Sequence, residues 1–309
     1  MEIKLLINKE LFNASLYNSK NPTIINLDNT RISNYHSLQV ISMKIFPFLI
    51  LFIISNYSIA QKNSLFESIE YRNAYEKETR QRNGLPGDTY WQYRSDYAIE
   101  ASFDPASGII KGSMRVTYFN ESPDSLNILV FKLMQNIYKR GANRQIATEE
   151  INIHEGIKIE NISFNDRPIN ENLLGISGTV MRLSLPEFIA KNSEAIITLD
   201  FATPLPKKSG FRSGAIDSTS FFAAYWFPQI AVYDDIFGWD IDEYVGTPEN
   251  YNDFSNYLVE ITIPSHYNIW ATGEHINKKE IFSSEILKKI NVSKRSGNPV
   301  MIIEEIAST

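Results

Sequence analysis

The chain has 309 residues, of which 43% are hydrophobic and 21% charged, so it can bury a sizeable core and does not have the composition of a disordered protein. Its 30 Lys and Arg against 36 Asp and Glu give a formal net charge of −6 at pH 7. This balance argues against a nucleic-acid-binding surface, which needs a basic stripe to neutralise phosphates, and the absence of cysteine excludes disulfides, thiolate chemistry and cysteine zinc sites.

The N-terminal 60 residues differ from the rest of the chain. Residues 1–42 are polar and rich in Asn, show no period of 2 or 3.6, and are predicted to be a non-native or disordered extension. Met43 and Lys44 then open an apolar run that ends in a small-x-small pattern at Ala60. This order is typical of a secretory signal peptide over residues 43–60.

A signal peptide in this position implies that translation starts at Met43 and that the product is exported, to the periplasm or beyond the cell. The apolar run falls short of the ~20 residues that span a bilayer, so no permanent membrane anchor is expected. The alternative interpretation is an internal apolar segment in a cytoplasmic protein.

Residues 61–87 are predicted to be a helical lead-in to the main domain. Ser64 and Glu67 fit a capping box at the start of a helix that continues to about Arg80. The sequence Asn-Gly-Leu-Pro-Gly at residues 83–87 ends it, because Gly and Pro interrupt helices.

From residue 88 to residue 309 the chain is predicted to be one β-rich domain. Alternating apolar residues over Tyr97–Phe103 and Ile110–Tyr118, joined by a turn, indicate a hairpin with one buried face. Leu126–Leu133 is apolar on both sides, as in a central strand. Further strands are expected at residues 157–164, 179–185, 195–201, 221–227, 256–263, 267–272 and 299–304.

Helical signal in this domain is limited to a turn after Pro186 and to Glu280–Ile290. Strands separated by short turns favour a mainly β fold, a large antiparallel β saddle or sandwich with a short N-terminal helix and a few further short helices.

The sequence predicts no metal site, no cofactor and no catalytic residue within this chain. Its four histidines, His36, His154, His266 and His275, include no pair with the i, i+4 spacing of a zinc-protease helix. A Gly-x-Ser-x-Gly elbow and a Gly-rich phosphate loop are also missing.

The segment Phe221–Gly246 concentrates aromatic rings and carboxylates. Asp234 and Asp235, near Trp226, Tyr233 and Trp239, could face a sugar ring as a glycosidase acid pair does. Neighbouring residues of a strand point to opposite faces, however, so we expect these acids to cap turns and bind the loop backbone instead.

The same segment resembles the N-terminal domain of the aminopeptidase N family of gluzincin zinc metallopeptidases (peptidase family M-one), especially its secreted bacterial branch. The matching residues are an aromatic-Pro segment at 226–228, the acids at 234–235, a strand at 259–264 and an Ala-Thr-Gly turn at 271–273. Residues 86–126 are similar to the family's opening hairpin.

Residues 298–302 are similar to a late strand of the same domain, so the resemblance covers roughly residues 86–305. It implies a β saddle that walls one side of a peptide cleft and docks a zinc-binding catalytic domain. The catalytic motifs, His-Glu-x-x-His and Gly-x-Met-Glu-Asn, are not present in this chain. Asp217 or Ser218 stands where the family has a substrate-facing glutamine.

We therefore expect a non-catalytic domain, truncated at its C-terminus, whose partner is a zinc-peptidase catalytic domain in cis or encoded next to this chain. Zinc and peptide would bind only through that partner. A free-standing β sandwich that binds carbohydrate or peptide is the alternative. The candidate cleft or docking surface consists of Trp226, Gln229, Tyr233, Asp234, Asp235 and Trp239.

Overall fold

The computed structural model describes residues 2–9 and 66–303. Residues 2–9 and 74–303 belong to one compact unit, and residues 66–73 belong to a second. The predicted signal peptide at 43–60 lies outside the described residues. Within the described parts of the chain, no helix is long and apolar enough to cross a membrane.

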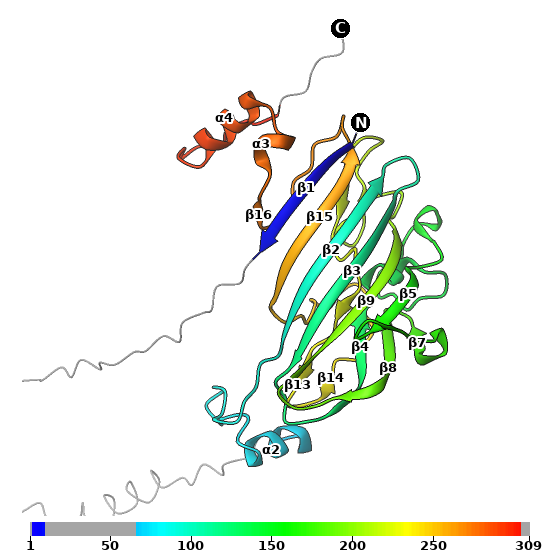
Figure 1. The fold of residues 1–309 in the computed structure, drawn as a ribbon, viewed down its shortest axis with the longest axis vertical. Coiled ribbons are helices and arrows are strands. Elements are labelled where there is room, and N and C mark those ends of the chain that lie inside the picture. The colour runs from blue at the N-terminus through cyan, green and yellow to red at the C-terminus, as the bar shows by residue number, and fades with distance from the viewer. Residues whose placement is uncertain (1, 10–65, 304–309) are drawn as a thin grey trace, which may run out of the picture. The chain divides into compact units, whose positions relative to one another are not determined.

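The main unit is built on an eight-stranded sheet that confirms the mainly β prediction (Figure 1). All neighbouring strands in it are antiparallel except β15 and β2, which run parallel. In spatial order the strands are β16 (Glu274–His275), β1 (Glu2–Lys9), β15 (Ser255–Pro264), β2 (Arg94–Asp104), β3 (Ile109–Asn120), β9 (Ser193–Pro204), β5 (Lys158–Phe164) and β6 (Arg167–Pro168).

The predicted hairpin is β2–β3, paired from Arg94 opposite Phe119 to Asp104 opposite Ile109. A second sheet has the order β12 (Gln229–Ile230), β4 (Leu126–Lys132), β8 (Val180–Ile189) and β7 (Leu174–Ser177). β4 is an interior strand of this sheet, as its apolar sequence predicts. Two further pairs are β10 (Ser213–Ala215) with β11 (Phe221–Ala223), and β13 (Tyr233–Asp234) with β14 (Gly238–Trp239).

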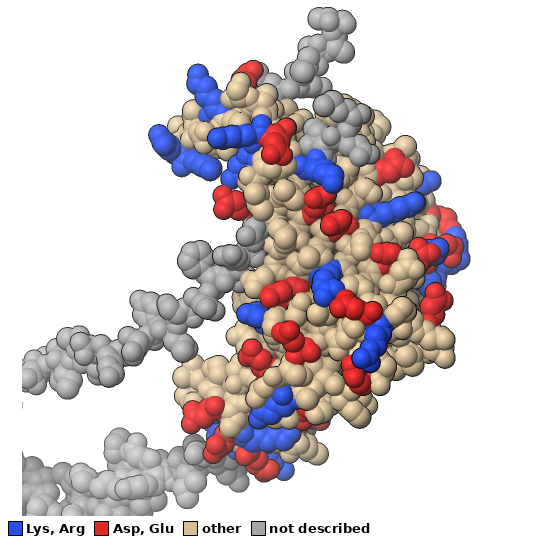
Figure 2. Space-filling view, in the orientation of Figure 1, with Lys and Arg blue, Asp and Glu red and all other residues tan. Residues whose placement is uncertain are grey.

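One hydrophobic core joins the inner face of the eight-stranded sheet to the second sheet. Val116 and Tyr118 of β3 and Leu129 and Phe131 of β4 are each 0% exposed. The opposite face of the large sheet alternates to polar residues, and Figure 2 shows acidic and basic side chains interspersed on the face in view. This is the pattern of a sheet with one packed and one solvated face.

The helices are short. α2 (Ile69–Glu76) falls within the predicted lead-in but is shorter than expected, and Ser64 of the proposed capping box lies outside the described residues. Three single 3₁₀ turns occupy Met134–Tyr138, Glu150–Asn152 and Glu171–Leu173.

The predicted helix at Glu280–Ile290 is observed as two helices, α3 (Lys278–Ile281) and α4 (Ser284–Ser293). The break falls at Ser283, whose Oγ accepts a hydrogen bond from the Ile286 amide at 3.2 Å and caps α4. The expected turn after Pro186 is wrong, because β8 continues to Ile189. Its register with β4 shifts between Ser184 and Ile189, and such an irregularity accommodates a proline without a ladder hydrogen bond.

Three predicted strands differ from the structure. The strand at 221–227 ends at Ala223, since Tyr225 adopts the left-handed conformation with φ 54°. Residues 267–272 form no ladder; Ile269 and Ala271 pack against the core, and Trp270 stacks on Phe282 with ring centroids 4.9 Å apart. Residues 299–303 are also outside any strand.

Glu2–Lys9, which the sequence analysis placed in an extension outside the native domain, instead form β1 between β15 and β16. Leu5 and Ile7 are 0% and 4% exposed, so alternate residues of this short run join the core. The run is too short to stand out in a polar segment, and its partner strand lies near the other end of the sequence. The rest of residues 1–42 lies outside the described residues.

Candidate functional site

The aromatic and acidic segment predicted as a docking surface contains only two- and three-residue strands. β11, β12, β13 and β14 follow each other along Phe221–Trp239, separated by irregular backbone. The segment lacks the long ladders of the large sheet, so its irregular backbone is fixed by side-chain hydrogen bonds and ion pairs together with the burial of Ile230, Val232 and Trp239.

Asp234 stabilises the β13–β14 hairpin from inside its turn. One carboxylate oxygen, Oδ1, accepts hydrogen bonds from the amides of Ile236 at 2.9 Å and Phe237 at 2.6 Å. The other, Oδ2, accepts from the hydroxyl of Tyr251 at 3.1 Å. Gly238 closes the turn with φ 72°, a conformation that favours glycine. Both oxygens of Asp234 are thus used by protein donors.

Asp235 points to a different partner, Arg80. Its side chain is 0% exposed, and Arg80 reaches both carboxylate oxygens, with Nη2 at 2.6 Å and Nε at 2.9 and 3.0 Å. Burial alone would raise the pKa of Asp235, but hydrogen bonds from Arg80 and Thr79 outweigh it and hold the pKa below its usual value. The Asp235 bonds likewise raise the pKa of Arg80 against the opposing effect of burial.

Two tyrosines border this ion pair. The Arg80 guanidinium lies over the ring of Tyr90, 5.0 Å from its centroid, which is a cation–π arrangement. Burial raises the pKa of Tyr90 and of Tyr251. We call Arg80, Tyr90, Asp234, Asp235 and Tyr251 the carboxylate cluster. Sequence reasoning missed its Arg and Tyr members, since nothing in the sequence links Arg80 to an acid 155 positions away.

The side chains of two further acids of the segment, Asp240 and Glu243, also contact protein donors. Lys132, whose side chain is 4% exposed, binds Asp240 Oδ2 at 2.8 Å and donates to the Asp242 carbonyl at 2.6 Å. The side chain of Glu243 accepts from Asn143 at 3.0 Å and from Ser177 at 3.2 Å. Asp240 and Glu243 thus have the surroundings of structural residues, and Asp234 and Asp235 do not face a common substrate space as an acid-pair hydrolase requires.

The predicted site residues divide into two groups. Tyr233, Asp234 and Trp239 come together on the β13–β14 hairpin, with the rings of Tyr233 and Trp239 5.1 Å apart and Asp235 at its turn. Tyr233 donates its hydroxyl to Asp124 Oδ2 at 2.7 Å. Trp239 is only 9% exposed and packs near Tyr118.

Trp226 and Gln229 lie before the hairpin. The Trp226 ring packs 5.1 Å from Phe227 and 6.0 Å from Phe201, and its carbonyl accepts from Thr203 Oγ1 at 2.7 Å. Gln229 lies in β12 opposite Lys132, and its Oε1 is buried without a hydrogen-bond partner. Because Trp226 and Trp239 pack against other core rings, they and Tyr233 do not offer three open faces for stacking on a sugar.

The exposed apolar side chains of this region are different residues. Phe237, at the hairpin turn, is 69% exposed, Phe254 is 67% exposed and Tyr251 is 50% exposed. The Tyr251–Asp234 hydrogen bond joins the segment before β15 to the hairpin. We call Phe237, Tyr251 and Phe254 the exposed ring set.

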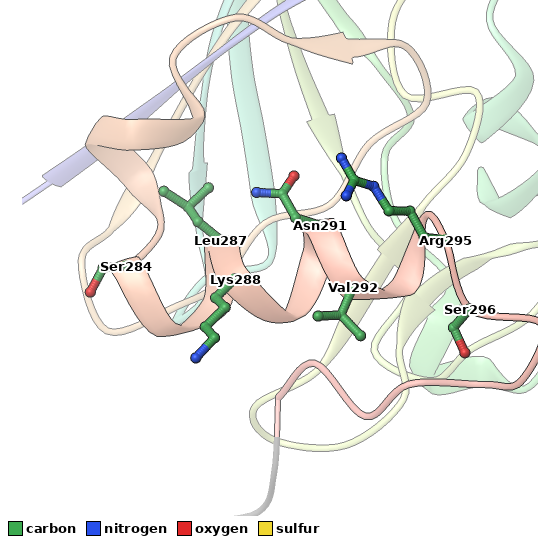
Figure 3. A pocket seen from close by; sticks show the side chains of 7 residues that line it. All are labelled: Ser284, Leu287, Lys288, Asn291, Val292, Arg295 and Ser296. Carbon is green, nitrogen blue, oxygen red and sulfur yellow. The ribbon is translucent and has the colours of Figure 1, made fainter.

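Two open grooves border the described surface. One, of about 780 Å³, lies beside the carboxylate cluster and is lined by Tyr90, Trp91, Gln92, Phe119, Asn120, Glu121, Asn192, Ser193 and Glu194. The other, of about 760 Å³, follows α4 and the residues after it. Figure 3 shows its side chains projecting from both sides of one helix, so they do not converge on an enclosed space.

The histidines and acids do not assemble a metal centre in the part of the chain that the structure describes, where no group of three or more potential ligands gathers. His154 accepts a hydrogen bond from the Gly156 amide at its Nδ1, 3.0 Å away, and burial lowers its pKa to about 4. His275 lies against Trp270 and Phe282, and His266 lies beside Tyr267. His36 is outside the described residues.

No family model and no curated protein matches this chain. Among solved structures, a two-domain M1 zinc metallopeptidase mutant bound to L-tryptophan aligns at 11% identity and a TM-score of 0.32, covering 59% of this chain and 35% of its own. The M1 zinc metallopeptidase from Deinococcus radiodurans aligns at 11% identity and a TM-score of 0.31, covering 58% and 34%.

Legionella pneumophila aminopeptidase A in complex with aspartic acid aligns at 19% identity and a TM-score of 0.23, covering 37% of this chain and 11% of its own. This chain therefore spans about a third or less of the length of these three structures. The alignments assign neither a family nor an activity to it.

Proposed function

We propose that residues 88–309 are the non-catalytic N-terminal β domain of an exported zinc aminopeptidase-like protein. Its role is to wall one side of a peptide cleft and to dock a catalytic domain, in cis or encoded next to this chain. Zinc and peptide bind to that catalytic domain. The proposal rests on the residue pattern shared with the aminopeptidase N family and on the geometry of the aromatic and acidic segment.

The observation that carries the proposal is the exposed ring set, in which Phe237 projects from a hairpin that is held in one conformation. Phe237 is 69% exposed, yet the hairpin that bears it is fixed by the Asp234 turn bonds and by Trp239 in the core. Apolar side chains presented by a rigid element are suited to a surface that another protein covers. The carboxylates of Asp234, Asp235, Asp240 and Glu243 accept hydrogen bonds or ion pairs from protein groups, and such engaged carboxylates suit a structural role better than a catalytic one.

The first test is to read the DNA beyond codon 309. An adjacent frame that encodes His-Glu-x-x-His supports the proposal. Unrelated genes in that position contradict it.

The second test measures binding of that adjacent polypeptide to this chain by isothermal titration. We expect Phe237→Ser to weaken binding by more than tenfold, since removing a central aromatic anchor costs about 2 kcal/mol. The matched control is Phe188→Ser, because Phe188 is a similarly exposed ring, at 68%, on β8. Equal binding by the Phe237 variant and the wild type contradicts the docking role.

A carbohydrate-binding module predicts another outcome. Glycan binding that is lost on Trp239→Ala, with the fold intact, would replace the docking proposal. The 9% exposure of Trp239 argues against that result.

A further inference from the structure

Strand β1 is held between two elements that are both remote from it in sequence. On one side it pairs with β15, from Glu2 opposite Pro264 to Lys9 opposite Tyr257. On the other side Ile7 and Asn8 pair with β16. Residues 10–65 separate β1 from the remainder of the described chain, so its place depends on this contact and not on a short connection.

Pairing with β15 favours a strand whose side chains alternate between apolar and polar residues. Leu5 and Ile7 are 0% and 4% exposed on the inner face. On the outer face the ammonium of Lys4 lies 2.6 Å from Glu260 Oε1. A strand with apolar residues at alternate positions and a cation near Glu260 satisfies both faces.

The other side recognises the backbone. Asn277 accepts a hydrogen bond from the Leu6 amide at 3.0 Å through Oδ1 and donates to the Lys4 carbonyl at 2.6 Å through Nδ2. The Ile276 amide donates to the Leu6 carbonyl at 2.8 Å. Main-chain bonds of this kind provide affinity for any extended peptide, and side-chain pockets then add specificity.

We propose that the edge of β15, together with Asn277, is a strand-acceptor site for an extended peptide with alternating apolar residues. Its occupant is the chain's own N-terminal segment, Glu2–Lys9. Without that strand, β15 would present a row of unpaired amides and carbonyls, which is a template for strand addition. In the exported form that the proposed function describes, whether translated from Met43 or cleaved after Ala60, the segment is absent and the site is open to a strand supplied by another molecule.

A cysteine pair tests the contact in the full chain, which has no cysteine of its own. The amide and carbonyl of Leu6 point toward Asn277 and Ile276, so Leu6 and Glu260 form a non-hydrogen-bonded pair of the β1–β15 ladder. The Cα atoms of such pairs are about 4.5 Å apart, within reach of a disulfide. The double variant Leu6→Cys/Glu260→Cys should form an intramolecular disulfide on mild oxidation.

The matched control is Leu6→Cys with Ser113→Cys on β3, two strands beyond β15, which should not cross-link. Non-reducing electrophoresis separates the outcomes. A monomer whose mobility shifts back on reduction supports the proposal. Absence of the bond contradicts it, and a bond between two chains contradicts the assignment of the chain's own segment as occupant.

A peptide-binding experiment tests the acceptor site itself. In the full chain, Leu5→Asp/Ile7→Asp places charges on the buried face of β1 and should empty the site. A fluorescent peptide of residues 2–9 should then bind this variant, and bind the wild-type chain roughly 100-fold more weakly, because the tethered strand competes at high effective concentration.

The control peptide has Asp at the positions of Leu5 and Ile7 and should not bind. Circular dichroism reports whether the variant keeps its β structure. Equal affinity of the residue 2–9 peptide for wild type and variant, or binding to neither, overturns the proposal.

Discussion

The β2–β3 hairpin and the segment Phe221–Gly246 are stabilised in opposite ways. The hairpin is a continuous ladder in which every second side chain enters the core. Many cross-strand side-chain pairs therefore each contribute a small part of its stability. The 221–246 segment has strands of two or three residues. It buries Ile230, Val232 and Trp239 in the core, and ion pairs and turn bonds fix the irregular backbone between them. Burial spread along the β2–β3 hairpin makes it a stable scaffold. In the 221–246 segment, a few strong polar contacts hold an irregular surface in one conformation.

The largest expected effect belongs to the core. Phe131→Ala in β4 removes a ring that is 0% exposed and leaves a cavity, so the free energy of unfolding should fall by about 3–5 kcal/mol. Phe188→Ala, at a ring that is 68% exposed, should change it by no more than about 0.5 kcal/mol. Urea unfolding of both variants measures the difference, and similar losses would contradict the described burial.

Within the irregular segment, the buried ion pair should matter most. Asp240→Asn leaves the ammonium of Lys132 buried without its carboxylate, at a cost of about 3 kcal/mol. The control Asp166→Asn breaks an exposed pair with Arg115 and should cost less than about 1 kcal/mol. Equal costs would show that Lys132 reaches solvent and that this contact does not fix the segment.

The Arg80–Asp235 pair should have a smaller effect, since the Arg80 side chain is 31% exposed. We expect Asp235→Asn to lower the free energy of unfolding by about 1–2 kcal/mol. Asp234→Asn keeps an oxygen that can cap the hairpin turn and should cost less. A reversed order of the two variants would mean that the turn and not the ion pair holds the carboxylate cluster.

The same pair predicts a pH dependence. The pKa of Asp235 is lower in the folded protein than in the unfolded chain, so its contribution is complete above the unfolded value of about 3.9 and is lost as the pH falls through the folded pKa. The stability gap between wild type and Asp235→Asn should therefore narrow below pH ~4. Urea unfolding of both proteins at pH 7 and at pH 3 measures this difference in the free energy of unfolding. A difference that is larger at pH 3 than at pH 7 would contradict a lowered pKa of Asp235 in the folded protein.

Local sequence pattern was sufficient to predict the β2–β3 hairpin. The alternation of Tyr97, Ile99 and Ala101 with polar residues specified which face of β2 is buried. Successive side chains of a strand point to opposite faces, so neighbouring residues are enough to reveal the pattern. The caps at Asp234 could also be anticipated, since an aspartate bonds to amides two or three residues on. These features need no knowledge of distant partners.

Contacts between distant residues could not be predicted. Arg80 lay in a predicted helix with no sign of its acid partner. β1 lay in a polar segment, and its partners on the acceptor strand are 248 (Lys9 to Tyr257) to 262 (Glu2 to Pro264) positions away. The run at 267–272 has strand-like composition but packs its apolar side chains without a ladder partner. In each case tertiary contacts outweighed local propensity.

Hydrogen–deuterium exchange of this chain, with and without the zinc-peptidase catalytic polypeptide that we propose as its partner, tests the docking role most directly. The account predicts that amides around Phe237 and over Tyr251–Phe254 gain protection on mixing, while the polar face of the eight-stranded sheet is unchanged. Protection confined to that polar face, or none anywhere, would contradict it.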